Sequence, residues 1–194
     1  MIVSSGAVRL IRAICSLLRM LLVILRIVKG QQLIDSGLGE QIIEFDKQNM
    51  KPILEKAGIE FPEEKRRKGL RSNPTFIIAF DGRSLAGYLE YLRSWNDPNY
   101  IYVGSIQIDE KYRNTRLILE LIDKFRDLVA EEDFVGFETN VQKANLPAVK
   151  MYRKIGFRLE ENPNNDDSWI ARADRRIMRE SPVIGLIDKW RSRR

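Results

Sequence analysis

Acid–base chemistry in this 194-residue chain must come from a short set of residue types. The sequence contains no histidine and a single cysteine, Cys15. The lack of imidazole excludes His–carboxylate triads, imidazole bases and the commonest zinc sites. A general acid or base must therefore be a tyrosine, a glutamate, an aspartate, a lysine, the thiol or a water molecule.

One tyrosine, Tyr152, lies in the stretch Phe134–Phe157, which reads FVGFETNVQKANLPAVKMYRKIGF. The stretch begins as a strand rich in aromatic and β-branched residues and continues as a helix, with Asn145 as its cap and Gly156 at its end. Residues three apart form the apolar face of this helix: Leu146, Val149, Tyr152 and Ile155. Spacing alone favours an ordinary strand–helix unit, in which Tyr152 is a core aromatic and Asn145 is only a cap.

The net charge of +6 is concentrated at the two ends of the chain. Residues 1–30 and residues 171–194 each carry a net charge of +5, so the body between them is mildly acidic at −4. We expect the basic ends to meet an anionic partner, such as a membrane surface or nucleic acid, while the body handles a neutral or cationic ligand. A single cysteine excludes a disulfide framework and is consistent with a cytoplasmic protein.

The most hydrophobic segment is residues 7–29, AVRLIRAICSLLRMLLVILRIVK. Arg12, Arg19 and Arg26 are seven residues apart and would form one line on an otherwise apolar helix. The arginines disfavour a transmembrane helix and interrupt the apolar run that a signal peptide needs. We expect a helix over residues 1–30 that packs into the domain or against a second copy in a homodimer. A helix lying in a membrane interface, with the protein peripheral to the membrane, is the alternative.

Residues 31–73 are expected to be helical at first and then irregular. Residues 31–58 place apolar side chains at helical spacing, with a break or a new first turn near Pro52 and a stop at Gly58. Residues 60–73, EFPEEKRRKGLRSN, are predicted to form a charged, solvated loop.

From Thr75 the apolar period changes to that of strands. Thr75–Phe80 and Leu85–Leu92, joined by Asp81 and Gly82, predict a β-hairpin. Tyr100–Ile108 predicts a third strand, in which Gly104 marks a bulge or the close approach of a ligand. Further elements follow in the order helix, strand, helix, strand, strand, over residues 116–130, 134–140, 145–156, 157–161 and 169–173.

This order predicts an α/β (α+β) fold. Strand 100–108, helix 116–130 and strand 134–140 form a crossover unit, which requires the two strands to be parallel. Residues 31–177 should therefore form a domain with a mixed, mostly antiparallel sheet, a parallel central pair and helices on both faces, followed by a basic tail over residues 178–194. Such sheets bind ligands at the carboxyl ends of parallel strands, beside a helix N-terminus.

In this context the stretch Phe134–Phe157 resembles the GCN5-related N-acetyltransferase (GNAT) family. The family pattern V-x-x-x-N-x-x-A-x-x-x-Y-x-x-x-G-F is matched by Val141, Asn145, Ala148, Tyr152, Gly156 and Phe157. The order of elements also matches over residues 31–177. The resemblance implies a domain whose central parallel strands splay apart, and an enzyme that transfers an acyl group from acetyl-CoA to an amine by direct attack.

An earlier family motif, V-x-P-x-Y-R-G-x-G-x-G/A, is less well kept. Tyr112 and Arg113 are retained, but Asn114, Arg116 and Ile118 replace glycine or small residues. Pyrophosphate binding in such a loop depends on backbone N–H groups and the helix dipole, which side chains do not remove. A working but altered site and a lost site both remain open. The second would make the chain a catalytically inactive binding or scaffold protein of the same fold.

The resemblance assigns roles to individual positions. Ile106 and Ile108 match strand positions whose backbone pairs with the pantetheine arm of CoA, and Asn145 matches a contact with that arm. The pyrophosphate loop corresponds to Arg113, Asn114, Thr115, Arg116, Leu117 and Ile118. Tyr152 matches the general acid that protonates the departing CoA thiolate, a role that suits tyrosine in a chain without imidazole. No metal is implied.

The general base is not identified by either motif. Glu90 and Glu138 are strand carboxylates that could line the slot and take the proton directly or through water, although each is more simply explained as a solvated strand residue. The acceptor is a small-molecule amine or a protein amine, and resemblance of fold does not decide between them.

Overall fold

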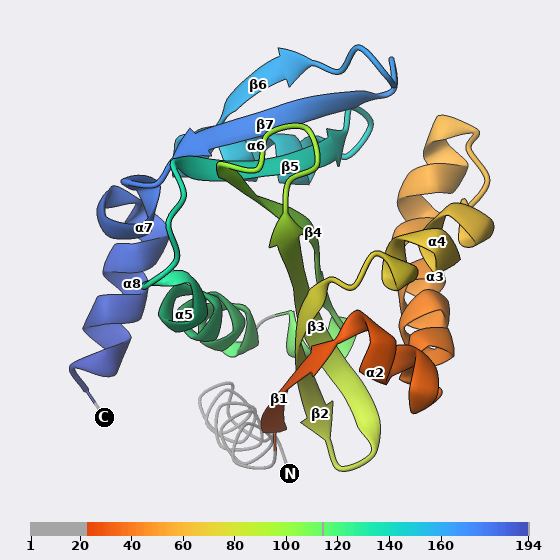
Figure 1. Ribbon diagram of the computed structural model, residues 1–194, viewed down its shortest axis with the longest axis horizontal. Helices are drawn as coiled ribbons and strands as arrows, with labels where there is room; N and C mark the ends of the chain where they lie inside the picture. The colour runs from red at the N-terminus through yellow and green to blue at the C-terminus, as the bar shows by residue number, and fades with distance from the viewer. Residues whose placement is uncertain (1–22, 114, 194) are drawn as a thin grey trace, which may run out of the picture.

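The structure is a computed structural model that describes residues 23–113 and 115–193. They form a seven-stranded sheet with the order β1-β2-β3-β4-β5-β7-β6 (Figure 1). The strands are β1 (Val23–Lys29), β2 (Thr75–Asp81), β3 (Ser84–Arg93), β4 (Tyr100–Ile108), β5 (Gly136–Gln142), β6 (Arg158–Glu161) and β7 (Ser168–Asp174). The helices are α2 (Gly30–Asp35), α3 (Leu38–Ala57), α4 (Glu63–Arg71), the short 3₁₀ turn η1 (Glu110–Tyr112), α5 (Leu117–Val129), α6 (Leu146–Ile155), α7 (Ile177–Glu180) and α8 (Pro182–Arg191).

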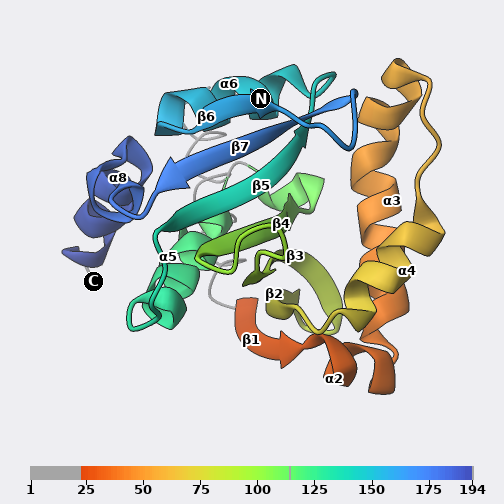
Figure 2. The same ribbon diagram turned by 45° about the horizontal axis from the view of Figure 1, so that its top comes forward.

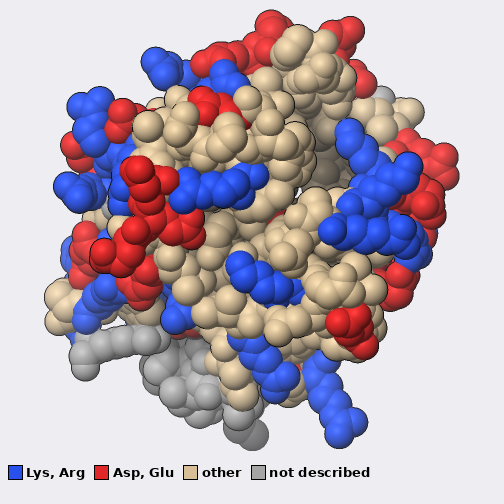
Figure 3. Space-filling view, viewed as in Figure 1, with Lys and Arg blue, Asp and Glu red and all other residues tan. Residues whose placement is uncertain are grey.

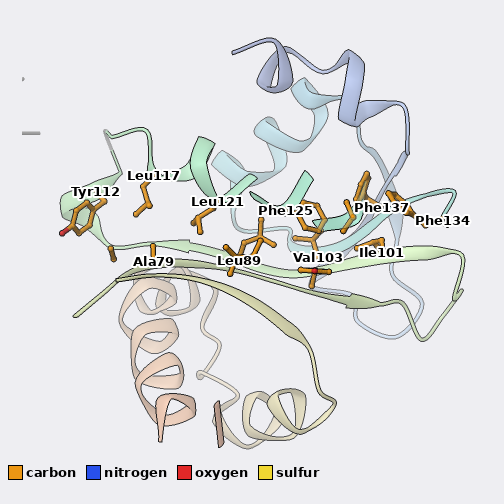
Figure 4. Packing of buried hydrophobic residues seen from close by; sticks show 14 residues of the cluster. Ala79, Leu89, Ile101, Val103, Tyr112, Leu117, Leu121, Phe125, Phe134 and Phe137 are labelled. Atoms are coloured by element: carbon orange, nitrogen blue, oxygen red, sulfur yellow. The ribbon is translucent and has the colours of Figure 1, made fainter. Parts of the chain in front are cut away.

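Helices cover both faces of the central strands, as predicted. Figures 1 and 2 show α3 and α4 on one side of β2–β4 and α5 on the other. A cluster of buried apolar residues, including Leu89, Leu121 and Phe125, fills the space between α5 and the sheet (Figure 4). A second cluster, which includes Ile42 and Phe76, lies between α3 and the opposite face. The strands are therefore held rigidly from both sides.

The predicted parallel pair is confirmed, and it is short. β4 and β5 pair only over Tyr100–Tyr102 and Gly136–Glu138, whereas every other neighbouring pair in the described sheet is antiparallel. Beyond Tyr102 the two strands are no longer paired. The fork that opens here is the feature on which the candidate site is built.

Local sequence signals of the later elements are also confirmed. Gly82 takes a left-handed conformation (φ 60°) in the turn between β2 and β3. The Asn145 side chain accepts a hydrogen bond of 3.2 Å from the N–H of Ala148 and so caps α6. Gly156 ends that helix with φ 111°, which a residue with a Cβ would adopt only under strain.

The helix expected over residues 1–30 is wrong for Val23–Lys29. Val23–Lys29 is the edge strand β1, which pairs antiparallel with β2 over its whole length. The segment VILRIVK is rich in β-branched residues, and Val23 and Leu25 pack against the core on the α5 side. Backbone pairing with β2 therefore decided the structure of this segment, although its arginines have the spacing of a helix. Residues 1–22, where the rest of that expectation falls, lie outside the described residues.

Two expectations between residues 31 and 73 are corrected as well. α3 continues through Pro52 instead of breaking there. The expected charged loop over residues 60–73 contains the helix α4, in which Arg67 forms ion pairs with Glu63 and with Glu40 of α3. A helix that carries charges on several sides has too weak an apolar period to be recognised from its sequence.

The basic C-terminal residues also contain helices, α7 and α8. Ile184, Ile187 and Trp190 of α8 form an apolar cluster with residues of α5. Arg191 is paired with Asp123 and Asp127 of α5 at 2.8 and 2.7 Å. Part of the positive charge at this end is therefore neutralised within the fold. None of the helices in the described part of the chain is both long and apolar enough to cross a membrane.

Candidate active site

The fork between β4 and β5 begins beside a bulge in β4. Tyr91 of β3 faces Val103, and the preceding Glu90 faces Ser105, so Gly104 has no partner in β3. The extra residue bends β4 away from β5 soon after their last shared pair. Gly104 is thus the bulge that its position in the strand predicted.

Ile106 and Ile108 lie beyond the bulge. They are partly buried, pack toward the α5 side of the sheet and pair with β3 along one edge. The other edge of β4 faces the fork and, within the described residues, pairs with no strand there. Its backbone N–H and C=O groups can therefore pair with an extended ligand, as an edge strand does.

The loop after β4 is held in place by its own residues. The Asp109 carboxylate accepts a 2.9 Å hydrogen bond from the N–H of Lys111, and the buried Tyr112 hydroxyl bonds to Asp81 at the end of β2. Arg113 extends to Asn49 of α3 at 3.1 Å. Asn114, one of the predicted site residues, lies outside the described residues.

The first turn of α5 leaves backbone donors available. Its N-cap residue is Arg116, which makes no side-chain capping hydrogen bond. Thr115 Oγ1 accepts a long 3.3 Å bond from the N–H of Leu117. The N–H of Ile118 has no acceptor within the helix, because the first amides of any α-helix lack one. These donors and the helix dipole can hold an anion.

Arg116 and Ile118, the described residues that replace glycine or a small residue in this loop, meet no backbone strain. Arg116 has φ −82°, and among the described residues the only non-glycine residue with positive φ is Asn73, far from the loop in the sequence. Position 116 therefore does not require glycine for its conformation. The exposed side chains of Arg113 and Arg116 add positive charge beside the free amides.

Tyr152 lies where β4 has already parted from β5. It packs in the small apolar cluster of Val141, Val149 and Ala171, and its ring meets that of Phe157 edge-on at 5.1 Å. Burial raises the pKa of the Tyr152 hydroxyl, opposed by a hydrogen bond with Thr139 of β5. The hydroxyl therefore keeps its proton at neutral pH and can donate it.

Glu138, one of the two expected bases, is completely buried and fully engaged. Ser94 and Asn96 donate to Oε1 at 3.2 and 2.9 Å, and Arg172 Nε donates to Oε2 at 2.9 Å. Arg172 Nη2 completes the ion pair, 2.8 Å from the same oxygen. These contacts hold β5, β7 and the β3–β4 loop together. The surroundings of Glu138 are those of a structural ion pair.

Glu90, the other expected base, is buried on the α3–α4 face of the sheet. Burial raises the pKa of its carboxyl group, opposed by Arg66 of α4, whose Nη1 lies 2.7 Å from Oε2. A Cβ built on Gly104 would lie 3.0 Å from Glu90 Cδ, so the carboxyl group rests directly on the bulge. A carboxylate whose pKa is raised above its ordinary value is the stronger base and is suited to accept a proton.

Sequence reasoning missed a second tyrosine at the fork, Tyr102. It belongs to the last parallel pair, opposite Glu138, and Asn140 of β5 donates to its hydroxyl at 3.3 Å. Burial and the nearby Glu90 raise the pKa of Tyr102 to about 12. The exposed indole of Trp95 lies against its ring, with centroids 5.2 Å apart. Tyr102 could have been recognised as a site residue only from its place in the last parallel pair, and that place is known only once the register of β4 and β5 is known.

The fork opens into a hollow on the molecular surface. Figure 3 shows this hollow between the layer of β5, β7 and β6 and the helices α3 and α4. The elements around it include β3 and β4, which carry Glu90 and Tyr102, and α4, which carries Arg66.

Gly104→Ala tests whether the bulge positions Glu90. The added methyl group must displace the Glu90 carboxyl group, and we expect a loss of about 1–3 kcal/mol in the free energy of unfolding. Chemical denaturation measures this loss. Gly69→Ala is the matched control: Gly69 lies inside α4 with open space around its Cα, so alanine there should stabilise the protein by about 0.5–1 kcal/mol. Equal stability of wild type and Gly104→Ala would contradict the contact.

The chain is similar in sequence and in fold to one family of enzymes. The sequence profile of the Acetyltransferase (GNAT) family matches residues 41–157. Curated protein sequences gave no match.

Solved structures of similar fold come from bacteria, archaea and plants. They include the PaiA N-acetyltransferase of Thermoplasma acidophilum in complex with coenzyme A (17% identity, TM-score 0.57) and a GNAT-family acetyltransferase of Staphylococcus aureus (19%, 0.58). A third is NAA60 of Arabidopsis thaliana in complex with a bisubstrate analogue (15%, 0.53). The alignments cover 78% of this chain in each case and 98%, 99% and 97% of the other chains. At these identities the likeness is one of fold.

Proposed function

The chain belongs to the GNAT family of acetyltransferases, and on this premise we propose that it transfers an acetyl group from acetyl-CoA to an amine by direct attack. The observation that carries the proposal is the fork between β4 and β5, which opens beside the Tyr152 hydroxyl. Direct transfer requires little covalent chemistry from a protein. It requires that two reactants are held in line and that protons are moved.

The acyl donor would lie along the open edge of β4. Ile106 and Ile108 offer their backbone groups to its extended arm, and Asn145 at the start of α6 offers a side-chain amide. The pyrophosphate would be held by the first amides of α5, at Leu117 and Ile118, with Arg113, Thr115 and Arg116 around them. Asn114 is assigned to the same loop from the sequence motif alone. The uncapped start of α5 supports this assignment.

Tyr152 is proposed as the general acid. Attack of an amine on the thioester expels a thiolate, which is a moderately basic leaving group and needs a proton. The Tyr152 hydroxyl is available for this step because burial keeps it protonated. The chain has no histidine that could take its place.

Glu90 is proposed as the general base, in preference to Glu138. An acceptor amine is protonated at neutral pH and must lose a proton before or during attack. Glu138 already accepts three hydrogen bonds and lies in an ion pair with Arg172, whereas no well-aligned hydrogen bond from the described residues reaches Glu90 Oε2. The carboxylate with free acceptor capacity is the better base.

Two measurements test this function. Calorimetry with acetyl-CoA is expected to give a dissociation constant below about 1 mM, in the range of enzyme KM values. Thiol release from acetyl-CoA should then depend on the addition of a primary amine from a panel of alkylamines, polyamines and peptides. The proposal fails if no heat of binding is detected at millimolar acetyl-CoA.

A second candidate is a protein of this fold that binds acyl-CoA without catalysis. The observation in its favour is that Arg116 and Ile118 place side chains where the family motif has glycine or another small residue. Binding of acetyl-CoA without amine-dependent thiol release across the panel would favour this candidate. Turnover with any amine would exclude it.

A further inference from the structure

A buried charge cluster lies between α3, α4 and β3. It consists of Asp46 from α3, Arg66 from α4, and Tyr88 and Glu90 from β3. Arg66 donates from Nε to Asp46 Oδ2 at 2.6 Å and from Nη2 to the Tyr88 hydroxyl at 3.2 Å, and that hydroxyl donates to Asp46 Oδ1. The side chains of Asp46 and Glu90 are only 6% and 5% exposed.

The charges in this cluster do not balance. Two carboxylates face a single guanidinium group, because Tyr88 is uncharged: burial raises its pKa well above the ordinary value. Tyr102 of β4, whose pKa Glu90 helps to raise, is also neutral, since that pKa is about 12. With both carboxyl groups ionised the cluster holds one excess negative charge. A buried ion without a counter-charge is costly.

The unsatisfied part of the cluster is Glu90. Arg66 Nη1 approaches Oε2 at 2.7 Å but off the direction of its N–H bonds, so no well-aligned hydrogen bond from the described residues reaches this buried oxygen. Asp46, by contrast, accepts bonds on both oxygens. The missing positive charge and the missing hydrogen-bond donor therefore fall on the same carboxylate, beside the bulge at Gly104.

We propose that this cluster is a binding subsite for a primary alkylammonium group, which supplies the missing charge and donates hydrogen bonds to Glu90. This proposal rests on the proposed function, because the ammonium is taken to be the protonated form of the acceptor amine. Among the described residues no group of three or more acidic, cysteine or histidine side chains could hold a metal ion instead. The low exposure of Glu90 favours a slender ammonium on an alkyl arm over a bulky cation.

A proton is the competitor of the ammonium at this site. Burial raises the pKa of both Glu90 and Asp46, opposed by Arg66, so at low pH a bound proton neutralises the excess charge. As the pH rises the proton leaves and the carboxylate becomes free for the ammonium. Ammonium affinity should therefore increase as the pH rises through the raised pKa of the carboxyl group.

The test is an NMR titration of the full-length protein without acetyl-CoA. n-Butylammonium chloride is added at constant ionic strength, with n-butanol as the uncharged probe of equal length. We expect saturable shifts of the backbone amide signals of Gly104 and Ser105 with the ammonium and none with the alcohol. Glu90→Gln should weaken the affinity at least about tenfold, because it removes the charged acceptor. Asp46→Asn, which removes the excess charge without touching Glu90, should weaken it by a smaller factor.

Glu64→Gln is the control, because Glu64 lies on α4 with its side chain 85% exposed. It should leave the titration unchanged. Equal shifts with butanol, an unchanged affinity in Glu90→Gln, or no shift at 100 mM ammonium would each overturn the subsite. The titration contains no acetyl-CoA, so its result is independent of the transferase proposal. If the ammonium binds but calorimetry detects no binding of acetyl-CoA, the subsite is supported and the transferase function is refuted. If the protein turns over acetyl-CoA but the ammonium causes no shifts, the subsite is refuted and the transferase function is supported.

Discussion

Tyr152→Phe is expected to lower kcat by about 100-fold or more, the usual contribution of a general acid. The ring and its packing on Phe157 are kept, so the fold and the dissociation constant for acetyl-CoA should change little. Wild-type turnover should not decline between neutral pH and the ordinary tyrosine pKa, because burial raises the pKa of the Tyr152 hydroxyl and so extends the range of its protonated form upward. Steady-state kinetics over pH, with calorimetry on both proteins, measures these effects.

The matched control is Tyr91→Phe. Tyr91 is another tyrosine whose pKa is raised by burial, but it packs in the core on the α5 side of the sheet against Phe125. Loss of its hydroxyl should lower stability by about 1 kcal/mol and leave kcat unchanged. If the two variants have the same kcat, Tyr152 is a core residue and the proton on the thiolate comes from water.

Arg172→Met is expected to be the most destabilising of the substitutions considered. It leaves the Glu138 carboxylate buried with hydrogen bonds from Ser94 and Asn96 but without its only cationic partner among the described residues. Breaking such a pair by removing one partner costs about 3–5 kcal/mol. The Arg172 side chain is 27% exposed, so we expect the lower end of this range and a fall in Tm of about 6–12 °C. Differential scanning calorimetry gives both quantities.

Arg176→Met serves as the control for lost charge alone. Arg176 pairs with Asp174 at 3.1 Å, but the two side chains are 75% and 56% exposed. Water replaces the partner in such a pair, so the melting temperature should not change measurably. A comparable fall in both variants would show that net charge, and not the buried pair, is responsible.

The elements between Thr75 and Asp174 could be predicted from the sequence because their signals are local. The Asp81-Gly82 turn, the cap at Asn145 and the stop at Gly156 each act within a few residues, and the structure has all three. The parallel arrangement of β4 and β5 followed from the single helix between them. The two family motifs, one around Tyr112 and Arg113 and one from Val141 to Phe157, then indicated that an acyl-CoA site would lie at the end of β4 and the start of α6.

Pairing between distant segments limited the prediction for the N-terminal half. Val23–Lys29 has the composition of either a helix or a strand, and its partner β2 begins 46 residues after the end of β1 at Lys29, as the Lys29–Thr75 contact shows. The α4 segment was taken for a solvated loop because a short run of charges shows no apolar period. Within that run, Arg66 is largely buried between two carboxylates. Burial of this kind depends on α3, which the charges of α4 alone do not reveal.

By itself the sequence determined the order of the elements from Thr75 to Asp174, the family resemblance and the set of residues that can carry protons, because each of these depends on neighbours in the chain. Only the tertiary structure decided what the two candidate bases can do. Glu90 and Glu138 are both strand glutamates, yet Glu138 meets Arg172 with full hydrogen bonding whereas Glu90 shares Arg66 with Asp46. The difference arises from partners 20 or more residues away along the chain. The charge balance of a buried carboxylate is set by those partners and cannot be read from the strand that carries it.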